Sequence, residues 1–232
     1  MSMVLEFVQV PDIPFNENGV KFMVVLGDIF SENTDAIVIT TDAQFTFTSQ
    51  LSSVLLKRGG HAIQRECKRI GTLTNRGAIT SAGTGNLFCK HIVHVLYPGT
   101  LAECKQATLA AANIASAKRL KSIAFPLIGG NSLRHPQMVS TITDALVISA
   151  RNGTLGSLVH VRLVGSTESV WSEFDKAMKG SIITRAVKTN SVLTPKSNLM
   201  QSKSVLDITA QPVCKPLVAT INVTKNLFLS RS

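Results

Sequence analysis

Short runs rich in Val, Ile and Leu alternate with longer helical patterns through residues 1–180. This alternation constrains the fold most, because strands separated by helices usually pair in parallel and carry helices on the faces of their sheet. The predicted strands cover residues 3–10, 21–26, 35–40, 77–82, 91–96, 121–126 and 159–165. The predicted helices cover residues 49–70, 102–118, 137–151 and 168–179. We therefore expect an α/β protein, a three-layer α/β/α sandwich with a mixed, partly parallel central sheet.

A change of composition near Gly180 divides the chain. Residues 181–232 are rich in Ser, Thr, Asn, Gln and Lys and show no sustained helical period. They hold seven basic side chains and one acidic one, and so carry six of the ten net positive charges. Widely spaced charges in a polar segment are typical of a solvated linker. The sequence predicts a folded domain over 1–180 and a basic linker or poorly ordered tail over 181–232, in which 218–223 could form an isolated strand.

Several classes of protein are not expected from this sequence. No apolar run approaches the roughly 20 residues that a membrane-spanning helix needs. The first ten residues, MSMVLEFVQV, lack the basic start and cleavage pattern of a signal peptide. The four cysteines show no paired spacing, which predicts reduced thiols in an intracellular protein of the nucleus or cytoplasm. The histidines have no metal-ligand partners at suitable spacing, so we expect no metal and no cofactor.

The loop in SIAFPLIGGNSLRHP, residues 122–136, is suited to binding a phosphate. A strand runs into Gly129 and Gly130, and Pro136 stands in the predicted first turn of the following helix. Glycines let backbone N–H groups face a ligand, and a helix N-terminus adds free donors. The alternative is an ordinary tight turn, and these residues alone leave both open.

Two carboxylates follow predicted strands in other loops. Asp28 follows the strand over 21–26 and could accept a hydrogen bond from an amine such as that of adenine, or could cap the turn after it. Asp42 ends the stretch DAIVITTD, where a buried strand gives way to hydroxyls and a carboxylate. In sheets of this type ligands bind beyond the carboxyl ends of the strands, where such loops meet.

Four segments together resemble the macrodomain family, most closely the macrodomains of macro-PARP-type ADP-ribosyltransferases. They are Gly27-Asp28-Ile29, Asp35-Ala36-Ile37-Val38, RGAITSAGTGNLFCKHIVHVLYPG (76–99) and SIAFPLIGG (122–130). The resemblance runs from about Val20 to Met178. It implies a cleft for ADP-ribose, with Asp28 and Ile29 at the adenine and the 128–133 loop around the diphosphate. The ligand-binding residues implied in this way are Asp28, Ile29, Asp42, Ile128, Gly129, Gly130, Asn131, Ser132, Leu133 and His135.

The sequence departs from the family pattern in the loop after the strand over 35–40. The family's Asn-Ala-Ala-Asn reads Ile39-Thr40-Thr41-Asp42 here, and its glycine-rich loop reads Phe47-Thr48-Ser49-Gln50. An ionised Asp42 accepts hydrogen bonds, does not donate them, and repels a diphosphate. We expect Phe47 and Gln50 to fill the distal half of the cleft, and we expect no hydrolysis and no catalytic residue.

Three functions are consistent with these observations. The first is a non-catalytic module that binds ADP-ribose, an ADP-ribosylated protein or a related adenine nucleotide. The second is a degenerate macrodomain that binds protein or RNA through the basic surface of Lys57, Arg58, Lys68 and Arg69 and through the tail. The third is an ADP-ribosyl hydrolase in which Asp42 acts as a general base.

Overall fold

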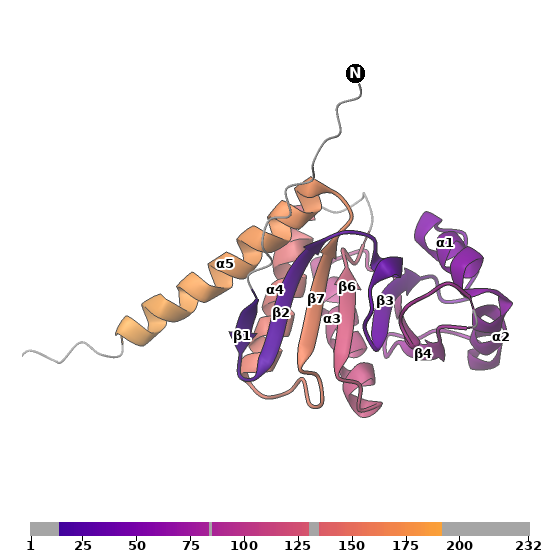
Figure 1. The fold of residues 1–232 in the computed structure, drawn as a ribbon, viewed down its shortest axis with the longest axis horizontal. Helices are drawn as coiled ribbons and strands as arrows, with labels where there is room; N and C mark the ends of the chain where they lie inside the picture. The colour runs from indigo at the N-terminus through magenta and orange to yellow at the C-terminus, as the bar shows by residue number, and fades with distance from the viewer. Residues whose placement is uncertain (1–13, 84, 130–134, 192–232) are drawn as a thin grey trace, which may run out of the picture. The chain divides into compact units, whose positions relative to one another are not determined.

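The computed structural model describes residues 14–83, 85–129 and 135–191. The strands predicted over 3–10 and 218–223 lie outside these ranges. Within them, the α/β/α sandwich is confirmed: a mixed seven-stranded sheet carries helices on both faces (Figure 1). No helix in the described ranges is both long enough and apolar enough to span a bilayer.

The strands follow the order β1-β2-β7-β6-β3-β5-β4 across the sheet. Strands β2, β7, β6, β3 and β5 are parallel, and β1 and β4 pair antiparallel at the two edges. The bounds are β1 Phe15–Glu17, β2 Val20–Leu26, β3 Ala36–Thr41, β4 Ala78–Ser81, β5 His91–Leu96, β6 Ser122–Pro126 and β7 His160–Gly165. Six of these match predicted strands, whereas the short β1 was not predicted.

The helices are α1 Gln50–Gly59, α2 His61–Ile70, α3 Leu101–Ala117, α4 His135–Arg151 and α5 Glu168–Ser191, with a short 3-10 turn, η1, at Ile29–Ser31. The single helix predicted over 49–70 is wrong. The chain breaks at Gly60, whose φ of 78° is left-handed and ends α1. Helix α5 continues past Gly180 to Ser191. The domain boundary at residue 180 stays a prediction.

The central strands present alternate residues to two separate hydrophobic clusters. On β3, Ala36 and Val38 face the cluster covered by α3, α4 and α5, whereas Ile37 and Ile39 face the cluster covered by α1 and α2. This is the alternation expected of a strand buried on both faces. The strand therefore holds the sheet between two cores, and its ends position the loops at either edge.

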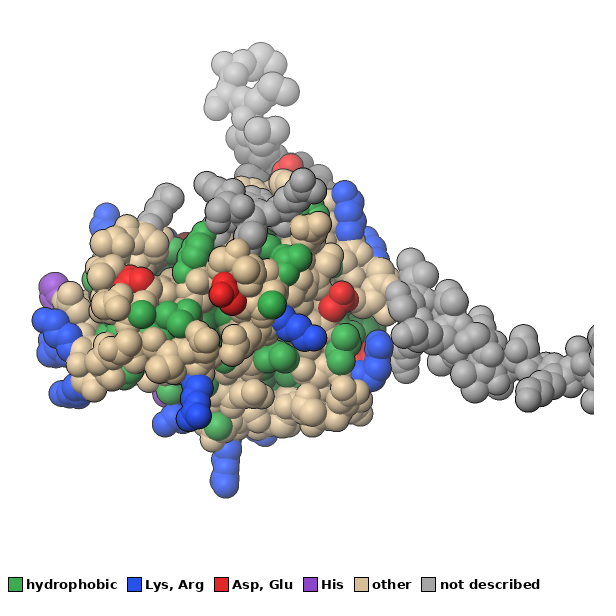
Figure 2. Space-filling model, turned by 180° about the vertical axis from the view of Figure 1, so that it is seen from behind, with side chains coloured by type: hydrophobic (Ala, Val, Ile, Leu, Met, Phe, Trp, Pro, Cys, Tyr) green, Lys and Arg blue, Asp and Glu red, His purple; other side chains and the backbone are tan. Residues whose placement is uncertain are grey.

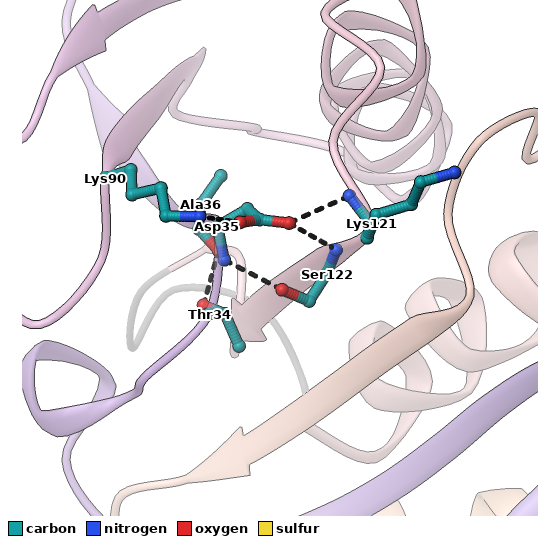
Figure 3. A network of polar contacts seen from close by, with 6 residues as sticks. All are labelled: Thr34, Asp35, Ala36, Lys90, Lys121 and Ser122. Carbon is teal, nitrogen blue, oxygen red and sulfur yellow. Dashed lines mark hydrogen bonds and ion pairs between the residues drawn. The ribbon is translucent and has the colours of Figure 1, made fainter.

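The amino edge of the parallel strands is held by Asp35 (Figure 3). One carboxylate oxygen lies 2.8 Å from the Lys90 ammonium, and the other accepts hydrogen bonds from the Lys121 and Ser122 amides at 2.9 and 3.1 Å. The Asp35 amide donates in turn to the Ser122 hydroxyl. The Lys90 hydrogen bond and these amides outweigh burial and lower the pKa of Asp35 from 3.8 to about 2. This network joins the starts of β3, β5 and β6, and so its role is structural.

Candidate functional site

The opposite, carboxyl edge of the sheet gathers the loops that the sequence singled out. Asp28 follows β2, Asp42 follows β3, and Ile128 and Gly129 follow β6. Two strands, β7 and β6, separate β2 from β3. Three strand spacings amount to about 14 Å. Asp28 and Asp42 therefore lie about three strand spacings apart along this edge, and the loop after β6 lies between them.

Asp28 is both a turn cap and an exposed acceptor. One carboxylate oxygen accepts a hydrogen bond from the Phe30 amide at 3.1 Å, which begins the η1 turn and confirms the capping alternative. The side chain nevertheless stays 42% exposed, while the neighbouring Ile29 is buried in the core. Gly27 joins this turn to β7, because its amide donates to the Gly165 carbonyl at 3.0 Å. A fixed turn thus presents a carboxylate to solvent at the sheet edge.

Arg58, near the end of α1, is an unexpected neighbour of Asp28. Its guanidinium lies 2.8 Å from the second Asp28 oxygen and 5.3 Å from the centre of the Phe30 ring. The sequence predicts a basic surface that includes Arg58. No local signal indicates that it reaches Asp28, because this contact depends on how α1 packs on the sheet.

The position of Arg58 is set by the loop between β4 and β5. The Asn86 amide donates to the Arg58 carbonyl at 2.8 Å. A Cβ at Gly85 would lie 1.8 Å from that same carbonyl oxygen, so the close approach requires glycine. The glycines of SAGTGNLF therefore hold the end of α1 in place.

The loop after β6 begins in the core. Ile128 is fully buried, and its carbonyl lies 3.7 Å from the Cys104 thiol, which donates to it. Gly129 has a φ of 108°, and a Cβ there would lie 1.8 Å from the Met138 methyl group. The remaining predicted phosphate-loop residues, Gly130, Asn131, Ser132 and Leu133, lie outside the described residues, as does the side chain of His135. Their assignment to a ligand stays a prediction.

Asp42 directs its carboxylate into its own turn. One oxygen accepts from the Gln44 and Thr46 amides at 2.9 and 3.1 Å, and the other accepts from the Thr46 hydroxyl at 2.6 Å. Burial raises the pKa of Asp42, but the hydrogen bonds from Thr46 and Gln44 lower it more, so it lies below the usual value. A carboxylate held ionised by neighbouring donors in this way is a weak base toward water.

The residues after Asp42 fold into the core in left-handed conformations. Phe45 and Phe47 have φ values of 53° and 55°, are both buried, and stack with their ring centres 6.3 Å apart. They share the cluster that contains Ile39 and Leu55. A left-handed backbone usually favours glycine, because a side chain strains it. Burial of the two rings offsets this strain at Phe45 and Phe47. Phe47 is therefore a core residue, and the side chain of Gln50 lies outside the described residues.

The buried titratable groups near this loop are uncharged core residues. His94 is fully buried on β5, contacts the Thr80 hydroxyl through Nε2 at 3.0 Å, and meets the Phe45 ring edge-on. Burial lowers the pKa of His94 to about 4, which keeps it neutral. Burial also raises the pKa of Cys67 to about 12. The described residues contain no cluster of His, Cys, Asp and Glu able to hold a metal ion.

Comparison with known protein families identifies one matching model. The model of the Macro domain matches residues 38–141. The Macro domain-containing protein SCO6450 of Streptomyces coelicolor is 30% identical over 128 residues, which cover 48% of this chain and 73% of that protein. Human protein mono-ADP-ribosyltransferase PARP14 is 29% identical over 178 residues, or 76% of this chain. The matched region spans 10% of PARP14.

Solved structures show the same fold at lower sequence identity. The Oceanobacillus iheyensis macrodomain with ADP superposes with a TM-score of 0.68 at 19% identity, and the match covers 75% of this chain and 97% of that one. A point mutant of that macrodomain, solved with ADPR, also superposes with a TM-score of 0.68 and covers 74% of this chain and 99% of that one. A Trypanosoma brucei macrodomain in complex with ADP-ribose gives a TM-score of 0.61 at 14% identity, covering 67% of this chain and 68% of that one.

Proposed function

The chain belongs to the macrodomain family, and on this premise we propose that it is a non-catalytic module that binds ADP-ribose, an ADP-ribosylated protein or a related adenine nucleotide. The position of Asp28 supports this most directly. Its carboxylate follows β2 on a turn fixed by Phe30 and remains exposed at the carboxyl edge. An adenine amine is a hydrogen-bond donor that such a carboxylate accepts.

The bound molecule would extend from Asp28 along the edge toward the loop after β6. Gly129 adopts a backbone conformation that favours glycine, and its loop leads into α4. A loop before a helix N-terminus suits a diphosphate because backbone N–H groups and the helix dipole both favour negative charge. Asp42 would then lie at the ribose end, about three strand spacings from Asp28.

Asp42 also supports binding without hydrolysis. A general base must accept a proton from water, whereas this carboxylate already accepts hydrogen bonds from Gln44 and Thr46 and has a lowered pKa. The alternative of an ADP-ribosyl hydrolase would require the 42–46 turn to open. A module that reads ADP-ribosylated proteins would act in the nucleus or cytoplasm, where we place it.

Calorimetric titration with ADP-ribose tests the proposal. We expect saturable binding by the full chain and about tenfold weaker binding by D28N, because a hydrogen bond to a charged group is replaced by one to a neutral amide. D144N, an equivalent change on the exposed side of α4, is the matched control and should bind like the wild type. Absence of heat from the wild type at millimolar ADP-ribose would overturn the proposal.

A further inference from the structure

Helices α1 and α2 carry a group of cations that the ADP-ribose site does not use. Lys57, Arg65, Lys68 and Arg69, which we term the α1–α2 corner, are all exposed. Among the ion pairs of the described residues, these side chains take part in none. Figure 2 shows blue side chains gathered at the left of the view, on the side where α1 and α2 lie. Arg58 is excluded because it pairs with Asp28.

The amphipathic character of α2 places its basic residues on the side that faces solvent. Ile63 and Cys67 are buried on the inner side of the helix, so the basic residues occupy its outer side. Glu66 is the helix's acidic residue, and it accepts hydrogen bonds from the amide and hydroxyl of Ser81 on β4. Arg65 and Arg69 lie one turn apart, a rise of about 6 Å. The outer side of α2 is therefore a row of cations, and the one acid of the helix, Glu66, is engaged by Ser81.

An exposed aromatic ring stands in the loop that packs against the end of α1. Phe88 is 67% exposed, more than the other large exposed hydrophobic residues that the structure describes. Its loop is fixed to the end of α1, since the Asn86 amide donates to the Arg58 carbonyl and Leu87 lies against Gly59. Among the described residues, no aromatic ring or cation stacks on this ring, so its face is available to a ligand.

We propose that the α1–α2 corner and Phe88 together bind single-stranded nucleic acid, a function beyond the recognition of ADP-ribose. Cations spaced along α2 would contact successive phosphates, and an unpaired base would stack on Phe88. A duplex keeps its bases stacked internally and would leave Phe88 unused. An acidic peptide would use the cations alone. The combination of a basic row with one exposed ring therefore favours a single strand.

Lys57, Lys68 and Arg69 stand in the last turns of their helices, where cations also stabilise the helix dipole. Arg65 and Phe88 have no such role, and so each variant changes one of them. We would measure the fluorescence anisotropy of a labelled uridine oligonucleotide of about ten nucleotides with the full chain. The variants are R65E/K68E and F88A. Their matched controls are K105E/K118E, on α3 and at its C-cap, and I148A on α4, which change exposed residues on the opposite face of the sheet.

We expect binding that weakens with salt and a slope of log K against log salt that falls by about 1.4 in R65E/K68E, because each single-strand phosphate contact contributes about 0.7. F88A should weaken binding by about fivefold or more, whereas both controls should match the wild type. The proposal is overturned if R65E/K68E binds like K105E/K118E. It is also overturned if F88A keeps full affinity, or if a duplex binds more tightly than the single strand.

Discussion

The Arg58 guanidinium lies 2.8 Å from the Asp28 carboxylate and places a cation where an adenine amine would bind. Both side chains are about 40% exposed, at 39% and 42%, so the pair contributes little to stability. The pair matters instead for ligand binding. The Phe30 amide already donates to the other Asp28 oxygen, so an adenine amine would compete with Arg58 for the second one.

Removing the Arg58 charge should free an acceptor for the ligand. We expect R58Q to bind ADP-ribose about threefold to tenfold more tightly, since the adenine amine would no longer compete with the guanidinium for the same oxygen. Calorimetry would measure the affinity and thermal denaturation the stability, which should change by less than about 1 kcal/mol. K57Q, a change at the adjacent exposed residue, is the control. Weaker binding by R58Q would show that Arg58 holds Asp28 in its binding position instead.

Phe47 offers a test of left-handed backbone in the loop after β3. F47A should lower the free energy of unfolding by about 3 kcal/mol, because a buried ring is lost. F47G should be about 1 kcal/mol more stable than F47A, since a φ of 55° suits glycine and not alanine. Urea denaturation would measure both. At a buried loop position with a negative φ, F47A would be more stable than F47G. That result would contradict the left-handed conformation of Phe47.

Gly129 should resist substitution for a similar reason. We expect G129A to lower the free energy of unfolding by about 1–3 kcal/mol, because a φ of 108° strains a residue with a Cβ and the Met138 methyl group must move. G180A is the control, since a Cβ there meets nothing within 4 Å inside α5. It should raise stability by about 0.5–1 kcal/mol. Equal denaturation midpoints for the two variants would contradict the strain at Gly129.

The Asp35 network predicts a defined pH dependence of stability. Its pKa is lowered to about 2, so its stabilisation is fully present above the unfolded pKa of 3.8 and is lost as the pH falls toward 2. D35N should therefore cost about 2 kcal/mol at neutral pH and progressively less below pH 4. Urea denaturation across this range would measure the difference. A D35N deficit that persists unchanged at pH 2 would exclude the carboxylate charge as its cause.

The sequence allowed the sheet to be predicted well, because β3, β5 and β6 are strongly apolar runs that periodicity detects. The helix predicted over 49–70 runs through Gly59-Gly60, although these glycines look like a turn, because a helical pattern continues on both sides and a glycine inside such a pattern can be tolerated. The short β1, which contains Asn16 and Glu17, lacks any such apolar run.

The candidate site could be predicted only where its residues are close in sequence. Asp28 follows its strand directly, and its capping of η1 is a local interaction. Its pairing with Arg58 and the burial of Phe45 and Phe47 arise from tertiary packing. Replacement of the family's loop glycines suggested a filled cleft. Instead, Phe47 keeps a glycine-like φ and turns its ring into the core.

Strand β3 begins beside one tethered carboxylate and ends beside another, and the two act on different parts of the molecule. Asp35 fixes the starts of three parallel strands, whereas Asp42 holds only its own turn. Alignment of the strands is consequently independent of the loops that would meet a ligand. This separation makes the fold a suitable scaffold for directed evolution: the exposed positions Gln44 and Thr48 can be randomised and selected for new ligands, while the buried Phe45 and Phe47 are kept and the amino-edge network preserves the sheet.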